Sequence, residues 1–419
     1  MNVTIYPHPL KGTLTTISSK SLSHRYLIAS SLANGRSRVD NILDSDDLMA
    51  TRSALSHFGI TFDRHFVHGG LKTYDKKIID CYESGSTLRF MIPLAMLFQE
   101  DITLTGRGRL PKRPLGVYKD LFLNKHVIFQ QPKDHELPLT LRGPLRGGRF
   151  ILRGDISSQF ITGLLFALPL LSDDSVIELS TPLESKSYVD LTLDVLRWFG
   201  IRVLDVPPFY YVPGNQDYQP REVTVEGDYS QAAFFLVAGL LSGPITLTNL
   251  SVSSRQGDRF IIDILKNMGG KIDVDGKNQQ VTAHLSTTHG ITIDLSDVPD
   301  LGPILMALAA VSKGTTHFIH AKRLRIKESD RIESMEKALQ QLGVDIRTTD
   351  DDVWINGRES LDGDVVLDGC RDHRIVMALS ILAMKAKAKI TIIGAEAIEK
   401  SYPNFFKDYR YLGGVVDET

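Results

Sequence analysis

Two segments of the sequence follow one pattern: LRGDISSQFITGLLFALPLLSDDSVIELS at residues 152–180 and TVEGDYSQAAFFLVAGLLSGPITLTNLS at residues 224–251. Each begins with an extended run and Gly-Asp, continues with Ser-Gln and an apolar stretch of helical length, and ends in a small-residue turn and a second apolar run. The order predicts a strand, a polar turn, a buried helix and a second strand, which together make a βαβ unit.

The same unit recurs more loosely along the chain. The looser copies begin near Leu14, Ile78, Ile291 and Val365, so the starts are spaced by roughly 65 to 75 residues. Most copies continue into a second helix that should end at a glycine in the left-handed conformation: Gly59, Gly200, Gly269, Gly343 and Gly413. Six copies predict two domains of three units each, although any alternating α/β protein would also resemble the looser copies.

The bulk composition agrees with a large α/β protein of ordinary solubility. The chain has 419 residues, which is too many for one hydrophobic core, and a net charge of -2. This charge gives no reason to expect nucleic acid or a membrane as partner, so any anion site must come from local clusters of Lys and Arg. Its two cysteines, Cys81 and Cys370, exclude a disulfide scaffold or a cysteine-based zinc cluster and fit a reducing compartment.

The sequence shows no targeting or membrane segment. Residues 1–12, MNVTIYPHPLKG, lack the pattern of a signal peptide, which favours a cytoplasmic location. The longest uncharged stretch, Tyr229 to Ser254, is broken by Ser242-Gly243-Pro244. It therefore predicts a helix, a turn and a strand rather than a membrane span.

Six segments place polar or cationic side chains where a helix should begin. Free backbone N–H groups and the positive end of the helix dipole act there with Lys and Arg, which is how proteins bind phosphate and carboxylate groups. The segments are SSKSLSHR (18–25), ESGSTLR (83–89), PKRPLG (111–116), SSQ (157–159), RLRIKESDR (323–331) and DHR (372–374).

Taken singly, these segments leave the alternatives open. A charged helix face or a capped turn would look the same, and the basic stretch 107–113 also resembles a nucleic-acid-binding patch. Within the fifth segment, Lys327 and Arg331 are four residues apart, which predicts that they share one helix face. Asp300 precedes an uncharged helix predicted at 301–312, where it is either a helix cap or a base.

Together the segments resemble the ordered landmarks of the 5-enolpyruvylshikimate-3-phosphate synthase family. SSKSLSHR, KRPLG, SSQF, SKSYVDLTL, KESDR, DHRI and EKSYPNFF occur in the family's order between Ser18 and Phe406. The resemblance implies an α/β fold of two similar domains, each with three βαβαββ repeats in an inside-out α/β barrel, and an active site in the interdomain cleft. It implies one domain from residues 1–12 and 225–419 and another from residues 13–224.

The resemblance also implies the reaction and its partners. The enolpyruvyl group of phosphoenolpyruvate would pass to the 5-hydroxyl of shikimate 3-phosphate, without a cofactor or metal, in a cytoplasmic monomer. Asp300, Glu328 and Lys20 would be catalytic. Phosphoenolpyruvate would contact Lys20, Gly85, Arg113, Gln159, Arg331, Arg374 and Lys400. Shikimate 3-phosphate would contact Ser21, Arg25, Ser157, Ser158, Gln159, Ser185, Asp300, Arg323 and Lys327.

Two positions depart from the family's pattern, and three other functions stay open. Glu83 stands where the family has Asn in its Gly-containing turn, and Arg323 stands where many relatives have Asn. A transferase acting on UDP-N-acetylglucosamine is the nearest alternative, but it usually has a loop cysteine before the Arg-Pro element, and none precedes Arg113-Pro114 here. The others are a non-catalytic phosphate-ligand-binding protein and a nucleic-acid binder acting through residues 107–113, whose binding would weaken steeply with salt.

Overall fold

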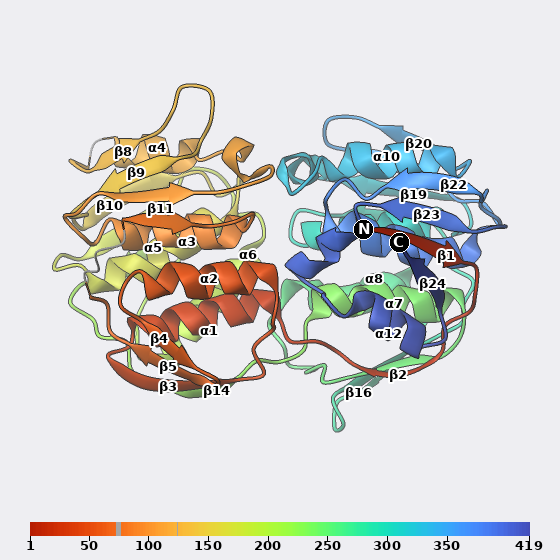
Figure 1. Ribbon diagram of the computed structural model, residues 1–419, viewed down its shortest axis with the longest axis horizontal. Helices are drawn as coiled ribbons and strands as arrows, with labels where there is room; N and C mark the ends of the chain where they lie inside the picture. Colours follow the sequence, from red (N-terminus) through yellow and green to blue (C-terminus); the bar gives the residue numbers. More distant parts are fainter. Residues whose placement is uncertain (73–76, 124) are drawn as a thin grey trace. The chain divides into compact units, whose positions relative to one another are not determined.

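The chain divides into two compact units, which Figure 1 shows in ribbon form. The computed structural model describes residues 1–72, 77–123 and 125–419. Unit 1 comprises Met1–Ser19 and Glu226–Thr419, and unit 2 comprises Lys20–Val225. The predicted boundary after residue 12 falls inside a strand that belongs to unit 1, so the chain enters unit 2 only after Ser19.

Unit 2 contains three mixed sheets and the helices that connect their strands. The sheets have the orders β14-β3-β5-β4, β6-β7-β9-β8 and β10-β11-β13-β12. The strands are β3 (Gly35–Asp40), β4 (Thr61–Asp63), β5 (Phe66–Gly69), β6 (Ile78–Asp80), β7 (Ile102–Thr105), β8 (Ile128–Gln130), β9 (Leu139–Arg142), β10 (Gly148–Leu152), β11 (Ser175–Leu179), β12 (Leu204–Val206), β13 (Phe209–Val212) and β14 (Glu222–Thr224). The helices are α1 (Lys20–Leu32), α2 (Asp46–Ser56), α3 (Gly85–Ala95), η1 (Leu110–Lys112), α4 (Gly116–Phe122), α5 (Ser158–Ala167), η2 (Leu168–Leu170) and α6 (Lys186–Trp198).

Unit 1 is built in the same way. Its sheets have the orders β16-β17-β15-β2, β18-β19-β21-β20 and β22-β23-β1-β24. The strands are β1 (Asn2–Tyr6), β2 (Gly12–Thr15), β15 (Ile245–Thr248), β16 (Lys271–Asp275), β17 (Gln280–His284), β18 (Thr292–Asp294), β19 (Thr315–Ile319), β20 (Asp345–Thr348), β21 (Val353–Asn356), β22 (Val365–Asp368), β23 (Ile390–Ile393) and β24 (Val415–Glu418). The helices are α7 (Tyr229–Leu241), η3 (Gly257–Phe260), α8 (Ile261–Asn267), η4 (Pro299–Leu301), α9 (Gly302–Ala309), η5 (Lys322–Ile326), α10 (Arg331–Gln341), α11 (His373–Leu382), η6 (Ala383–Lys385), η7 (Ala395–Lys400) and α12 (Phe405–Tyr411).

Each sheet has the same internal arrangement, which confirms the repeat predicted from the sequence. A parallel pair comes first, as β10 pairs with β11, and an antiparallel hairpin is added beside it, as β13 and β12 are. A parallel pair needs a crossover connection, and a buried helix provides it. Among the described residues, six four-stranded sheets follow this plan. The fold is therefore the predicted α/β fold with βαβαββ repeats.

Strands β2 and β14 lie in sheets of different units. β2 leads along the chain to α1 of unit 2, yet it pairs in parallel with β15 of unit 1. β14 leads to α7 of unit 1, yet it pairs in parallel with β3 of unit 2. Each passage between the units thus begins with a strand that stays behind, and unit 2 is one continuous insertion in unit 1.

Within unit 1, the core is formed around α7, α9 and α11. Every residue of these helices is buried, and the helices contact one another. A helix that is apolar on all sides is stable in water only when other elements cover it completely. The uncharged stretch that begins at Tyr229 forms α7 and then β15, as predicted. The chain's ends meet beside this core, where β1 pairs with β24 (Figure 1).

The second helices end at left-handed glycines, as the sequence predicts. The φ angles lie between 78° and 101° at Gly59, Gly200, Gly269, Gly343 and Gly413. A residue with a Cβ would be strained in this conformation.

A second glycine position is set by close packing after β21. An added Cβ on Gly357 would lie 1.9 Å from the carbonyl oxygen of Ser312, just beyond α9. The next residue, Arg358, donates its backbone N–H to the carbonyl of Ala310 at 3.0 Å. The strand's end is thereby held against the end of the buried helix.

We predict that Gly357→Ala destabilises unit 1, because the new methyl group would push the backbone away from Ser312. Overpacking of this kind should lower the free energy of unfolding by about 2 kcal/mol, as measured by urea denaturation. At Gly243 the nearest atom to an added Cβ is 3.5 Å away, so Gly243→Ala is the matched control. Equal stability of the two variants would contradict the proposed packing constraint.

Candidate active site

In unit 1, Asp300 lies where several cations converge. It is in η4, directly before α9, and its side chain is 23% exposed. One carboxylate oxygen accepts hydrogen bonds from Arg331 Nη1 at 3.0 Å and Lys327 Nζ at 3.3 Å. The other accepts from Arg374 Nη2 at 3.1 Å, while Arg374 Nη1 donates to the backbone carbonyl of Asp300 at 3.0 Å. Asp300 therefore holds cations from different segments, and it does not cap a helix with its side chain.

Arg331 is the buried centre of this group. Only 1% of its side chain is exposed, and its Nε donates to Asp372 Oδ2 at 2.8 Å. Its Nη2 donates to Glu328 Oε2 at 2.8 Å. Burial lowers the pKa of Arg331, but Asp372, Glu328 and Asp300 outweigh this effect and hold the pKa above its usual range. The guanidinium thus links both candidate proton-transfer carboxylates.

Asp372 is the fully buried partner that fixes Arg331. Its side chain caps α11 by accepting from the backbone N–H of Arg374 at 2.9 Å, and it also accepts from Ser329 Oγ at 3.0 Å. Burial raises the pKa of Asp372, but the charge of Arg331 lowers it further, so the pKa lies below its usual value. The ionised carboxylate is therefore the stable form.

The path of the chain through RLRIKESDR differs from the predicted helix. η5 ends at Ile326, Lys327 is extended with φ -87° and ψ -155°, and α10 begins at Arg331 with Asp330 as its cap. Lys327 and Arg331 therefore do not share a helix face. They meet because the turn between the helices brings both side chains to Asp300.

Lys327 has an unusually acidic ammonium group. Burial lowers its pKa to about 8, the charges of Arg323 and Arg331 lower it further, and Asp300 and Glu328 act in the opposite direction. Its side chain remains 20% exposed. It is therefore a cation that changes charge near neutral pH and that a ligand could reach.

Asp258 and Ser230 extend the group behind Arg374. Ser230 Oγ donates to Asp258 Oδ2 and lies 3.2 Å from Arg374 Nη2, which donates to it. Burial, followed by the charge of Asp300, raises the pKa of Asp258 to about 6. Arg374 is thus held from both sides.

Two further predicted cations of unit 1 lie on neighbouring segments. Arg323 is in η5, is buried, and donates from Nη1 to the carbonyl of Ser296 at 3.3 Å. Lys400, the last residue of η7, donates from Nζ to the carbonyl of Arg371 at 3.0 Å. Arg371 directly precedes Asp372, so Lys400 contacts the segment that leads into α11.

In unit 2, Arg25 is a buried cation whose contacts are all uncharged among the described residues. Its guanidinium donates to Thr192 Oγ1 at 2.9 Å and to the carbonyls of Ser21 and Tyr188 at 2.8 Å. Burial lowers the pKa of Arg25 to about 10. A buried charge without a counter-ion is costly, so an anionic ligand would stabilise it.

Lys20 begins α1 and is paired with a residue of α2. Its Nζ lies 2.9 Å from Asp47 Oδ2, and the two side chains are 16% and 12% exposed. Thr87 of α3 donates to the backbone carbonyl of Asp47 at 3.4 Å and to Ser84 Oγ, the cap of α3, at 2.8 Å. The first turns of these helices are therefore joined by polar contacts.

The start of α3 is arranged around Gly85 and Arg113. An added Cβ on Gly85 would lie 2.5 Å from Arg113 Nη1, so only glycine lets this guanidinium lie there. Nearby, Arg89 Nη1 donates to Gln159 Oε1 at 2.7 Å, and Gln159 Nε2 donates to Ser86 Oγ at 2.9 Å. The structure thus connects the predicted residue Gln159 to the helix that Gly85 begins.

The predicted serines lie at the starts of α5 and α6. Ser157 caps α5 by accepting from the backbone N–H of Gln159 at 3.3 Å, and Ser158 is the first residue of that helix. Ser185 precedes α6, is buried, and has a left-handed backbone with φ 53°. Glu83, which departs from the family's pattern, packs its carboxylate over Gly108.

Several residues in these groups were not predicted. Asp372 was overlooked although it stands in the quoted motif DHR, because its partner Arg331 is far away in sequence. Asp47 begins a helix with an acidic first turn, which is a common cap pattern and carries no specific signal. Arg89 follows Gly85 by one helical turn, and this spacing could have indicated it.

The structure contains neither a membrane helix nor a metal cluster in its described part. None of the helices is long and apolar enough to cross a membrane. Among residues 1–72, 77–123 and 125–419, no group of His, Cys, Asp and Glu side chains is arranged to hold a metal ion. Cys81 is buried, and burial raises the pKa of its thiol, which disfavours the reactive thiolate.

Comparisons with known proteins agree on one family. The model of the EPSP synthase (3-phosphoshikimate 1-carboxyvinyltransferase) family matches residues 5–409. A 3-phosphoshikimate 1-carboxyvinyltransferase of Clostridium kluyveri is 46% identical over 423 residues, covering 99% of this chain and 98% of the relative. One of Clostridium novyi is 43% identical, covering 100% and 98%.

Solved structures give the same result for the fold. The EPSP synthase of Acinetobacter baumannii superposes with a TM-score of 0.82 at 26% identity, and each chain is covered completely. The enolpyruvyl transferase NikO of Streptomyces tendae superposes with a TM-score of 0.81 at 17% identity, covering 100% of this chain and 98% of its own. At that identity, the second match shows similarity of fold alone.

We predict that Arg331→Met destabilises the protein by about 3 to 5 kcal/mol, because it leaves the buried carboxylate of Asp372 without its counter-ion. Urea denaturation at pH 7 measures the effect. Lys337→Met breaks an exposed ion pair with Glu333 in the same helix and should cost less than about 1 kcal/mol. A similar, small effect of both substitutions would show that Arg331 does not hold the group together.

Proposed function

The chain belongs to the EPSP synthase (3-phosphoshikimate 1-carboxyvinyltransferase) family, and on this premise we propose that it transfers the carboxyvinyl group of phosphoenolpyruvate to the 5-hydroxyl of shikimate 3-phosphate. The reaction releases inorganic phosphate and is a step of the shikimate pathway to chorismate and the aromatic amino acids. The observation that carries the proposal is the family match over residues 5–409. The pairing of Asp300 and Glu328 with one buried arginine supports it.

Both substrates are multiply charged anions, so the enzyme must provide cations for them. A phosphate monoester carries a charge of about -1.5 to -2 at pH 7, and each substrate also has a carboxylate. We assign the anionic groups of phosphoenolpyruvate to Lys20, Gly85, Arg113, Gln159, Arg331, Arg374 and Lys400. We assign shikimate 3-phosphate to Ser21, Arg25, Ser157, Ser158, Gln159, Ser185, Asp300, Arg323 and Lys327. The uncharged contacts of buried Arg25 support an anion beside it.

The chemistry requires one proton to be added and one to be removed. Protonation of the methylene carbon of phosphoenolpyruvate makes the adjacent carbon electrophilic, and the 5-hydroxyl attacks there to form a tetrahedral adduct. Loss of phosphate and of a methyl proton then gives the enol ether. We propose that Asp300 accepts the hydroxyl proton and that Glu328 handles the proton at the methylene carbon, with Lys20 assisting catalysis. Arg331 contacts both carboxylates, so their protonation states are coupled.

The place of the reaction and the state of the enzyme are also part of the proposal. We propose a cytoplasmic monomer that binds these small molecules and neither nucleic acid nor membrane. Free Cys81 and Cys370 are consistent with a reducing compartment.

The function is tested by following phosphate release from phosphoenolpyruvate. Release should depend strictly on added shikimate 3-phosphate. Release with UDP-N-acetylglucosamine in its place, or release without any acceptor, would overturn the proposed acceptor.

We predict that Asp300→Asn and Glu328→Gln each lower kcat by roughly 100-fold or more, because each removes a group that transfers a proton. In deuterated water, single-turnover experiments should show slower deuterium incorporation at the methylene carbon in Glu328→Gln. Glu333→Gln is the control, since Glu333 is an exposed carboxylate of the same helix α10. Near-normal turnover by both active-site variants would refute the assignment.

We predict that kcat/KM for shikimate 3-phosphate falls as the pH rises above about 8. Lys327, whose pKa is about 8, is charged below this pH and neutral above it, so its attraction for phosphate is lost on the alkaline side. Lys327→Arg keeps its charge throughout this range. Its profile should therefore lack this decrease, whatever its absolute activity. An identical alkaline decrease in both enzymes would assign the ionisation to another group.

A further inference from the structure

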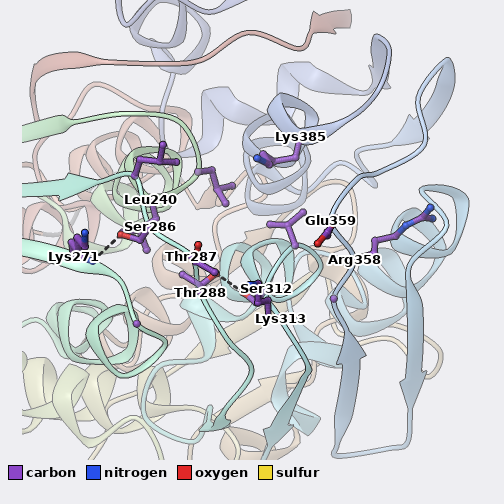
Figure 2. A pocket seen from close by; sticks show the side chains of 15 residues that line it. Leu240, Lys271, Ser286, Thr287, Thr288, Ser312, Lys313, Arg358, Glu359 and Lys385 are labelled. Carbon is purple, nitrogen blue, oxygen red and sulfur yellow. Dashed lines mark hydrogen bonds between the residues drawn. The ribbon is translucent and has the colours of Figure 1, made fainter.

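A hollow of about 650 Å³ opens in unit 1 near the C-terminal ends of buried helices (Figure 2). Its wall includes Leu240 and Leu241 at the end of α7 and Val311 to Lys313 just after α9. Lys385, the end of η6 after α11, and the segment that follows β21 also contribute. The volume is in the range of small-molecule binding sites.

The hollow is separated from the Asp300 group by the length of the buried helices. Asp300 directly precedes α9, and Arg374 lies in the first turn of α11, whereas the hollow lies beyond the other ends of these helices. Helices of this length span roughly 12 to 15 Å at 1.5 Å per residue. The two places therefore cannot share one small ligand.

The hollow carries an excess of positive charge that the protein does not neutralise. Lys271, Lys313 and Lys385 lie on different sides of it (Figure 2), and within the described residues their ammonium groups have no hydrogen-bond or ion-pair partner. Elsewhere in the unit, comparable lysines are paired, as Lys337 is with Glu333. Glu359 is the carboxylate in the wall, so the lysines outnumber it.

Arg358 also lines the hollow, but its guanidinium is already engaged. Its Nη1 donates to the carbonyl of Gly343 at 2.6 Å and lies 3.4 Å from Asp362 Oδ2. We therefore count only the lysines as cations available to a ligand.

Lysines at helix C-termini often serve to complement the helix dipole, but the carbonyl groups here have other donors. The backbone N–H of Ser286 donates to the carbonyl of Leu240 at 3.0 Å, and that of Arg358 donates to Ala310 at 3.0 Å. The N–H of Leu361 donates to the carbonyl of Lys385 at 3.4 Å. The lysines are thus not required to satisfy these helix ends.

The remaining wall suits an organic anion rather than a bare ion. Thr287 is an exposed hydroxyl of the wall, and Thr288 and Ser312 share a hydrogen bond of 2.7 Å. Leu240 and Leu285 add apolar surface beside these polar groups. A ligand with a carbon skeleton could contact this surface while its charged groups reach the surrounding lysines.

We propose that this hollow is a second anion site, which binds a small organic polyanion with at least two phosphate or carboxylate groups. Spaced charges on one molecule would reach lysines on different sides of the hollow. This occupant is separate from the substrates, and the proposal does not depend on the proposed reaction.

The test compares two variants that remove the same charge from unit 1. One is Lys271→Ala/Lys313→Ala/Lys385→Ala. The control is Lys277→Ala/Lys389→Ala/Lys407→Ala, whose lysines are exposed and do not line the hollow. Citrate and inorganic pyrophosphate are titrated separately into each full-length protein by calorimetry, so that carboxylate and phosphate ligands are distinguished. Thermal unfolding and kcat should be unchanged in both variants.

We expect the hollow variant to bind at least one probe about tenfold more weakly than the wild type, since each lost charge pair contributes up to about 1 kcal/mol. The control variant should bind as the wild type does. Glu359→Gln removes the opposing carboxylate and should strengthen binding a few-fold. Equal weakening in hollow and control variants, or no binding attributable to the lysines, would overturn the proposal.

Discussion

The buried guanidinium of Arg331 is the interaction on which the candidate active site of unit 1 depends. Its contacts reach Asp300 before α9, Glu328 in the preceding turn and Asp372 at the cap of α11. A carboxylate as deeply buried as Asp372 is stable only when paired, so the pair fixes two helix starts relative to each other. The reactive carboxylates thereby acquire their positions from a residue that is itself almost inaccessible.

The cations of the two units are prepared for anions in different ways. In unit 1, Lys327, Arg331 and Arg374 are held by Asp300, so their positions are set before a ligand arrives. In unit 2, Arg25 is held only by uncharged oxygens among the described residues, and its charge is compensated poorly. The first arrangement favours geometric order, whereas the second favours affinity for an incoming anion.

The repeat was predictable because its signals are local. Apolar helices bounded by Gly-Asp turns, and glycines at the ends of second helices, depend on neighbouring residues only. The contacts of the site were less predictable, since Arg331 and Asp372 are distant in sequence and meet only through the fold. The resemblance identified Arg331 but not its buried partner. Local reasoning also failed at Lys327, where helical spacing suggested a shared face and the chain instead makes a turn.

The exchange of β2 and β14 has a consequence for the order in which the protein can mature on the ribosome. Strands β1 and β2 are synthesised first, yet their partners β23, β24 and β15 emerge only after all of unit 2. Unit 2 is complete once β14 has emerged, so the inserted body can fold while the first strands still wait. The oldest part of the nascent chain is thus among the last to find its place.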